Sequence, residues 1–327
     1  MDRSYLKRLR AAVQWAIFAL VVYGGWRLYA FVRHFEAGGP YVERAPLVEG
    51  FLPIGALMSL KVWLTEGVFD RVHPAGLVIF ISAIALSLFF KKAFCSWMCP
   101  AGTVSELLYK TGARAFGRNL RFPGWLDYPL RSLKYVLMGF FLLVVIRMPA
   151  GGLQSFLGGA YWKVADIKML WFFKEMSELT AWVMGILFLG SLLYRNFWCR
   201  YLCPYGALLG LLSFLSPAKV TRDERACIHC GKCTRACPSL LPVEEKKRVR
   251  SPECTGCLGC VASCPAKGAL DLRTAGRAVH PLIHAGLLLL LFLGILWGAR
   301  LGGHWHSSVS YAEYRDLISV ARGLEHP

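Results

Sequence analysis

Eight cysteines in two equally spaced runs are the residues of this sequence with the clearest chemistry. Each run reads Cys-x2-Cys-x2-Cys-x3-Cys-Pro, and the two runs together contain Cys227, Cys230, Cys233, Cys237, Cys254, Cys257, Cys260 and Cys264. Three thiolates at two-residue spacing can ligate three corners of an iron–sulfur cube, while Gly231, Gly256 and Gly259 let the backbone curl close to it. A fourth ligand must then come from elsewhere in the chain. The spacing therefore predicts iron–sulfur clusters.

Zinc is the alternative metal for thiols at this spacing. Zinc sites usually combine separated Cys-x2-Cys pairs, so the third thiol of each run would have no role in them. The two complete runs favour clusters over zinc.

Four further cysteines lie where apolar segments meet charged residues. They occur in "FCSWMCPAG" and "FWCRYLCPYG", which share the pattern Cys-x3-Cys-Pro-x-Gly and place equivalent cysteines 104 residues apart. If a helix continues through each motif, its two cysteines lie on one face, about 6 Å apart along the axis. The proline after the second cysteine disfavours the helical region for that residue and predicts a boundary there. We call these four the rim cysteines: Cys95, Cys99, Cys199 and Cys203.

The repeated motif suggests an internal duplication of a two-helix unit that brings the rim cysteines together as ligands of a third metal centre. Two alternatives stay open at this point. The four can be small, buried, reduced residues that pack beneath the clusters, since free cysteine is among the most buried residue types. They can also form a pair of redox-active dithiols.

Long apolar segments must position these cysteines. With 56% hydrophobic residues, the chain is too apolar for an ordinary soluble domain. Five segments are expected to cross a membrane: Ala11–Val32, His73–Phe90, Leu133–Met148, Leu179–Leu193 and Val279–Gly298. The predicted fold is therefore mostly α, a polytopic helical membrane protein with a small domain between the fourth and fifth spans.

Charge sets the orientation of these spans. With the N-terminus in the cytoplasm, the inside segments hold 26 Lys and Arg residues and the outside segments hold 12. The positive-inside rule favours this arrangement, so the net charge of +18 reflects topology and not nucleic-acid binding. All twelve cysteines then lie on the cytoplasmic side, where thiols stay reduced, which argues against a disulfide framework. The C-terminus is expected in the periplasm.

The segment from Lys219 to Arg273 resembles the two-cluster ferredoxins of bacteria. In that family the fourth cysteine of each run ligates the cluster of the other run. Carried over to this chain, the resemblance implies one [4Fe–4S] cluster on Cys227, Cys230, Cys233 and Cys264. It implies a second on Cys254, Cys257, Cys260 and Cys237.

The complete arrangement, from about Ala11 to Arg277, resembles the NapH-type membrane polyferredoxins, relatives of MauN and of the C-terminal part of NosR. The resemblance implies an inner-membrane protein that transfers electrons between the quinone pool and a partner redox protein. A second implied function is electron supply for the maturation of a metalloenzyme, and a third alternative is a membrane scaffold for a redox complex. An electron-transfer subunit is favoured over a stand-alone catalyst, with no catalytic residue assigned. The tail after the fifth span maps onto no family function.

Three regions follow from these observations: a transmembrane region over 1–216, a two-cluster ferredoxin-like α+β domain over 217–275, and a fifth span with a periplasmic tail over 276–327. The expected partners are membrane lipid, quinone and a redox protein. His280 and His284, one turn apart at the start of the fifth span, can face a quinone headgroup or the clusters, but plain interfacial roles are favoured.

Overall fold

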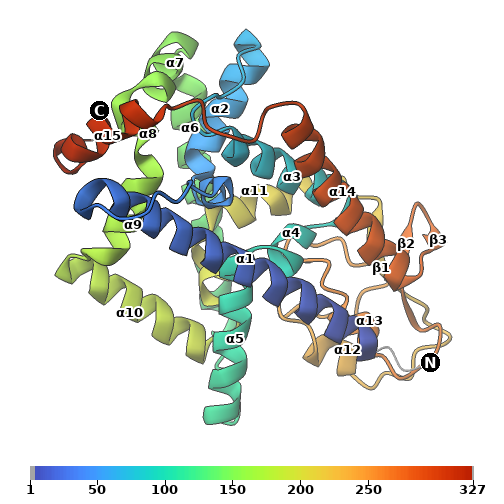
Figure 1. Cartoon of the computed structure of the whole chain (residues 1–327). Helices are drawn as coiled ribbons and strands as arrows, with labels where there is room; N and C mark the ends of the chain where they lie inside the picture. Colours follow the sequence, from blue (N-terminus) through green and yellow to red (C-terminus); the bar gives the residue numbers. More distant parts are fainter. Residues whose placement is uncertain (1–3, 326–327) are drawn as a thin grey trace. The chain divides into compact units, whose positions relative to one another are not determined.

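The computed structural model describes residues 4–325 and is mostly helical (Figure 1). The chain divides into two compact units, each assembled from three separate stretches of sequence. Unit 1 comprises Met1–Phe18, Ala83–Met138 and Val183–Phe292, and unit 2 comprises Ala19–Ser82, Gly139–Trp182 and Leu293–Pro327. Each unit is described by itself below.

Fifteen α-helices are formed by the described residues. They are α1 Ser4–Ala37, α2 Pro53–Glu66, α3 Pro74–Phe90, α4 Ala93–Trp97, α5 Pro100–Ala115, α6 Gly124–Arg147, α7 Ala150–Gly158, α8 Ala160–Lys163, α9 Ala165–Lys174, α10 Glu178–Leu193, α11 Pro204–Leu212, α12 Lys232–Arg235, α13 Gly259–Ala262, α14 Pro281–Leu301 and α15 Tyr311–Val320. Short 3-10 turns cover Pro46–Phe51 (η1) and Ala321–Gly323 (η3), and a π-helical turn covers Trp198–Leu202 (η2). Several helices begin at proline, whose fixed φ suits the first helical position.

Three helices are long and apolar enough to cross a membrane, namely α1 from Tyr5, α6 and α14. The other two predicted spans correspond to shorter helices. Helix α3 has 17 residues, and α10 joins α9 through a bend of 82° that makes the pair a broken span or a re-entrant segment. Five crossings therefore remain a prediction.

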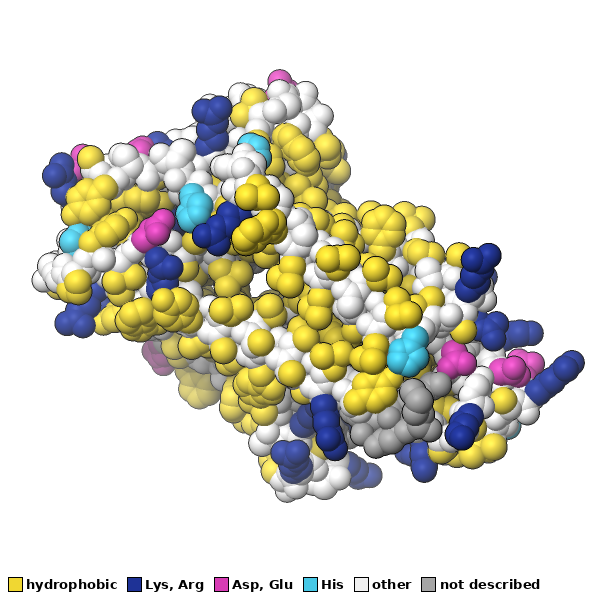
Figure 2. All heavy atoms as spheres, turned by 45° about the vertical axis from the view of Figure 1, so that its right-hand side comes forward, with side chains coloured by type: hydrophobic (Ala, Val, Ile, Leu, Met, Phe, Trp, Pro, Cys, Tyr) yellow, Lys and Arg dark blue, Asp and Glu magenta, His cyan; other side chains and the backbone are white. Residues whose placement is uncertain are grey.

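Large hydrophobic side chains stay exposed on the long helices. Trp26 on α1, Ile146 on α6, Leu179 on α10 and Leu290 on α14 are each more than half exposed. Figure 2 shows one face of the molecule on which such side chains form extensive patches. Contiguous apolar surface of this kind is typical of a membrane or protein interface.

In unit 1, the two Cys-x3-Cys-Pro motifs have related backbone paths. Helix α3 is followed by Lys91 and helix α10 by Asn196, both with positive φ, so neither apolar helix continues into its motif. A single short turn follows in each case, α4 in the first motif and η2 in the second. A new helix then begins at Pro100 or Pro204. This repeated path supports the predicted duplication.

The small α+β region of unit 1 has an antiparallel sheet in the order β1-β2-β3, formed by Ala218–Arg222, Leu270–Thr274 and Arg277–Ala278 (Figure 1). Ala218 pairs with Thr274 and Arg222 with Leu270, so the strands that flank the two cysteine runs lie side by side. Each run ends in a one-turn helix, α12 or α13. The sheet thus closes the segment that carries all eight cysteines.

Unit 2 contains helices that the sequence analysis did not anticipate. Helix α2 packs against α7, and Gly55 on α2 meets the ring of Trp162 so closely that a Cβ there would lie 1.8 Å from it. Tyr314 and Ile318 of α15 are buried in a core with Phe31 of α1. The tail that matched no family function therefore completes the core of unit 2.

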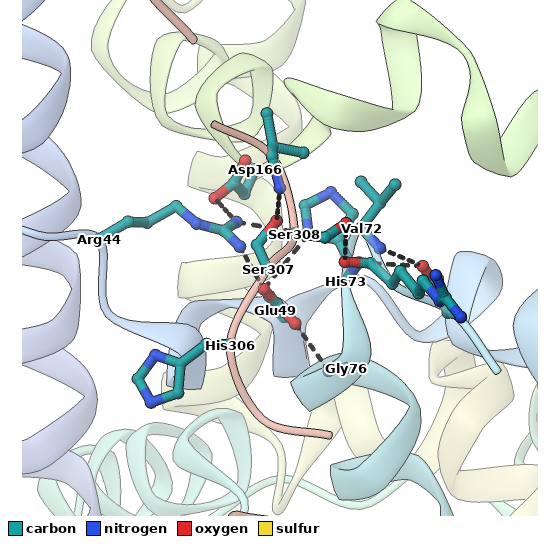
Figure 3. A network of polar contacts seen from close by, with 12 residues as sticks. Arg44, Glu49, Val72, His73, Gly76, Asp166, His306, Ser307 and Ser308 are labelled. Carbon is teal, nitrogen blue, oxygen red and sulfur yellow. Dashed lines mark hydrogen bonds and ion pairs between the residues drawn. The ribbon is translucent and has the colours of Figure 1, made fainter. Parts of the chain in front are cut away.

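A buried network of charges holds the loops of unit 2 together (Figure 3). Arg44 contacts the carboxylates of both Glu49 and Asp166, and neither carboxylate is exposed. Gly76 donates its backbone N–H to Glu49 at 3.0 Å, which satisfies a free donor in the first turn of α3. His73 Nε2 lies 2.7 Å from the carbonyl of Trp162, which can only accept, so this nitrogen carries a proton.

Replacement of Arg44 by Met is expected to destabilise unit 2 strongly. The substitution leaves Glu49 and Asp166 buried without their cation, a change that typically costs about 3–5 kcal/mol. Thermal unfolding in detergent measures the effect. Arg315→Met is the matched control, because Arg315 is 65% exposed and pairs with its neighbour Asp316. Equal melting temperatures for the two variants would contradict the importance of the network.

Candidate iron–sulfur sites

The first set of cysteines surrounds a hollow at the edge of the sheet. Its walls include Cys227, Cys230 and Cys233 of the first run and Cys264, the last cysteine of the second run. His229 and Gly231 both have positive φ, which curls the first run around the hollow. The thiol grouping is the one that the ferredoxin resemblance implies.

The second set of cysteines surrounds a separate hollow. Its walls include Cys254, Cys257 and Cys260 of the second run and Cys237, the last cysteine of the first run. Positive φ recurs at the positions equivalent to those of the first run, here Gly256 and Leu258. The glycine at position 256 is also required by packing, since a Cβ there would lie 2.8 Å from the carbonyl oxygen of Phe90.

The geometry of both sets suits a cluster of several irons. Among residues 4–325, no three His, Cys, Asp or Glu side chains converge on the position of a single metal ion. The thiols stand instead around hollows, with each run supplying three neighbouring ligands and the opposite run supplying the fourth. A single zinc ion needs four ligands drawn in to about 2.3 Å. Four thiols around each hollow are the donor set that a [4Fe–4S] cluster takes.

The two sets differ in their exposure. Ile228 beside the first hollow is 64% exposed, and all four thiols of that set are partly exposed. Cys237 and Cys260 of the second set are buried, and burial raises the pKa of Cys237 to about 12. A buried thiolate needs a compensating positive charge, which a bound metal provides.

The rim cysteines occupy the same positions in the two repeated paths. Cys95 lies in α4 and Cys199 in the π-helical turn, whereas Cys99 and Cys203 are the extended residues directly before α5 and α11. The prolines thus end the short turns as predicted. The condition that a helix continues through each motif is not met, because Cys99 and Cys203 are not helical.

The structure brings the four rim cysteines within electrostatic range of one another. Burial raises the pKa of Cys199 well above its usual range, and the charges of the other three rim cysteines raise it further. Burial likewise raises the pKa of Cys99 to about 11, with a contribution from Cys203. Four thiols within electrostatic range of one another are a candidate ligand set. Their packing is close, since a Cβ on Gly102 would lie 2.2 Å from the carbonyl oxygen of Cys95.

The first rim motif is hydrogen-bonded to the loop of the second cysteine set. Ser96 Oγ donates to the carbonyl of Thr255 at 2.7 Å, and Trp97 Nε1 donates to that of Gly256 at 3.3 Å. Both acceptors lie between Cys254 and Cys257. The carbonyls of that loop are therefore held against the segment that carries Cys95.

The second rim motif is hydrogen-bonded to the segment that follows Cys237 of the same set. Arg200 Nη1 donates to the carbonyl of Ser239 at 2.7 Å, and Asn196 Nδ2 donates to that of Pro238 at 3.3 Å. These acceptors directly follow Cys237. Both rim motifs thus contact the second cysteine set through the backbone on either side of its hollow.

A buried group of charges lies beside the rim cysteines, and the sequence analysis missed it. Lys134 Nζ contacts both carboxylate oxygens of Glu253 at 2.7 Å, and Lys92 Nζ lies 3.7 Å from the same carboxylate. Burial alone would raise the pKa of Glu253, but the two lysines hold it at about 2. One signal was available, because Lys134 falls inside the predicted span Leu133–Met148, and an ionisable residue in a span points to a functional partner.

His284 of α14 and His280, which directly precedes that helix, have different surroundings. His280 is exposed, and its Nδ1 accepts the N–H of Leu282. His284 is 2% exposed and packs edge-on against Phe90, with ring centroids 5.1 Å apart. Its Nε2 is buried and has no hydrogen-bond partner among the described residues.

Two family models match this chain over the segments that carry its cysteines. A 4Fe-4S binding domain matches residues 72–123 and 179–222, which contain both rim motifs. A 4Fe-4S dicluster domain matches residues 219–265, which contain both cysteine runs. The chain therefore has iron–sulfur ferredoxin domains.

Related proteins extend this similarity to the whole chain. The electron transport protein YccM of Escherichia coli is 42% identical over 97% of this chain and 91% of its own length. The ferredoxin-type protein NapH of Escherichia coli is 25% identical over 78% of this chain and 85% of its own. The methylamine utilization ferredoxin-type protein MauN of Methylobacillus flagellatus is 28% identical over 62% of this chain and 66% of its own. No solved structure matches this chain.

The similarity to YccM covers nearly all of both chains. The relationship to NapH and MauN that the motifs implied is also confirmed. The chain belongs to the family of ferredoxin-type iron–sulfur electron transport proteins that includes YccM, NapH and MauN.

Proposed function

We propose that this chain is a multi-pass inner-membrane protein that passes electrons between the quinone pool and a partner redox protein. The observation that carries the proposal is the pair of hollows, each walled by the four cysteines of one predicted ligand set. Iron–sulfur clusters bound there supply one-electron transfer. The chain itself contributes the ligands, the surrounding charge and the degree of exposure of each set.

The difference in exposure supports separate roles for the two ferredoxin sets. The first set has partly exposed thiols and an exposed neighbour in Ile228, so a redox partner in solution can approach it. The second set is more buried and is hydrogen-bonded to both rim motifs. We assign the first set to exchange with the partner and the second to exchange with the rim cysteines, which we propose hold a third iron–sulfur centre.

Two cysteine-to-serine variants are expected to lose the same spectroscopic signal when their cysteines belong to the same ligand set. Membership of the same run is not enough. If Cys264 completes the first set, Cys264→Ser removes the same electron paramagnetic resonance signal as Cys227→Ser and leaves the signal that Cys254→Ser removes. Cys95→Ser and Cys199→Ser are expected to remove one shared third signal. Iron and sulfide contents of anaerobically reconstituted protein check the count, at about eight of each for two clusters and about twelve for three.

Several outcomes would contradict this assignment. Grouping of Cys264→Ser with Cys254→Ser would replace the crossed ligand sets by uncrossed ones. A folded Cys95→Ser protein with full iron content and every signal intact would leave the rim cysteines as packing residues or dithiols. Zinc without labile sulfide in the reconstituted protein would reject clusters altogether.

The quinone link is tested at His284. Its buried Nε2, which has no partner among residues 4–325, offers a hydrogen bond to a quinone oxygen next to Phe90 at the end of α3. His284→Phe is expected to abolish cluster reduction by a short-chain quinol and to leave reduction by dithionite unchanged. His280→Ala is the control, because His280 is exposed and directly precedes the same helix. Unimpaired quinol reduction in His284→Phe would move the quinone site elsewhere.

The proposed topology has five spans, with the N-terminus and the ferredoxin-like region in the cytoplasm. It rests on the excess of Lys and Arg in the inside segments and on the need to keep the thiols reduced. A reporter fused after Arg273 is expected to be active as a cytoplasmic protein, and one fused after Pro327 as a periplasmic protein. A cytoplasmic signal from the second fusion would mean that α14 does not cross.

A further inference from the structure

The assignment of ligands does not explain why charged side chains are buried beside the rim cysteines. We propose that Lys92 and Lys134 are the counter-charges of an anionic metal–thiolate centre on the rim cysteines, and that Glu253 links this centre to the second cysteine set. They are positioning residues, since they act through the charge of the site and ligate nothing. The inference rests on the proposed third centre and adds the residues that set its charge.

The positions of the two lysines support this role. Lys92 is 4% exposed and Lys134 is fully buried. Both lie within electrostatic range of Cys95 and of Cys203, one cysteine from each rim motif. Lys92 directly precedes α4, which carries Cys95, whereas Lys134 comes from α6. Two separate elements therefore each place a lysine near the rim cysteines.

The positive and negative charges of this group do not balance without the thiols. Glu253 is the carboxylate within salt-bridge distance of both lysines, and it supplies one negative charge against two positive charges. Tyr135 donates its hydroxyl to Glu253 at 2.9 Å and adds no charge. Among neighbouring cations, Arg200 has its own carboxylate in Asp127, and Lys91 donates its Nζ to the carbonyl of Ser213. Within the group of Lys92, Lys134 and Glu253, one buried positive charge thus remains for the rim site.

An unbalanced buried charge is costly, so a negative partner is expected within reach. Isolated buried ions cost several kcal/mol each, and the loss of one partner typically costs about 3–5 kcal/mol. Four neutral thiols cannot supply that partner, but a centre ligated by four thiolates can. The lysines are therefore independent support for metal at the rim cysteines, obtained without reference to cysteine spacing.

The position of Glu253 explains how the two sites communicate. It directly precedes Cys254 of the second set, and it is 7% exposed. A change of charge at the rim cysteines acts on the lysines, and the lysines act on Glu253, next to a ligand of the second set. Reduction potentials of such centres depend on nearby charge, so this group is placed to influence both.

Redox titration followed by electron paramagnetic resonance tests the inference on the full-length, reconstituted protein. The rim signal is first identified as the one that Cys95→Ser removes. Lys92→Met and Lys134→Met are each expected to shift its midpoint potential downward, because the loss of a cation favours the oxidised centre. Glu253→Gln is expected to shift it upward. Opposite signs separate a charge effect from structural damage, which has no reason to reverse direction.

Lys110→Met is the matched control, because Lys110 lies on α5 of the same unit, is 52% exposed and pairs with Glu106. It is expected to leave the potential unchanged. If Lys134→Met loses the rim signal, Lys134→Arg, which keeps the charge, is expected to restore it.

An unchanged rim potential in both lysine variants would overturn the inference and leave the third centre in place. Failure of Lys134→Arg to restore a lost signal would also overturn it. If Cys95→Ser removes no signal from wild-type protein, the proposed third centre fails first and the lysines lose their role with it.

Discussion

The contact between the rim motifs and the backbone of the second cysteine set is the interaction on which unit 1 depends. Ser96 donates to Thr255 on one side of the hollow, and Arg200 donates to Ser239 on the other. These bonds link residues 159 and 39 positions apart in sequence. They join the ends of two apolar helices to the small cysteine-rich segment. The contacts of Lys92 and Lys134 with Glu253 hold the same segment from a further side.

The same contact explains why the helices must break where they do. An unbroken α3 or α10 would carry Cys95 or Cys199 onward along its axis and leave no backbone facing the cysteine loops. Lys91 and Asn196 adopt positive φ and redirect the chain into a single turn. Pro100 and Pro204 then start new helices. The match to the 4Fe-4S binding domain over 72–123 and 179–222 covers both of these turns.

Local spacing predicted the cysteine chemistry well, because ligands two or three residues apart are constrained by the backbone that joins them. The family resemblance supplied the crossed grouping around each hollow. Long-range pairs could not be predicted in this way. Lys134 and Glu253 are 119 residues apart, and Arg44 and Asp166 are 122 apart, so neither pair leaves a pattern in any short stretch of sequence. Helices α2 and α15 were missed because their burial depends on packing against distant segments, α7 for α2 and Phe31 of α1 for α15.

The place of α15 has a consequence for how the protein is made. Unit 2 combines α1, the helices after α6 and the last described helix, whose Ile318 fills the same core as Phe31. That core cannot close until α15 has been synthesised, although Phe31 is made at the beginning. The apolar helices between them are therefore synthesised while unit 2 still lacks one wall of its core.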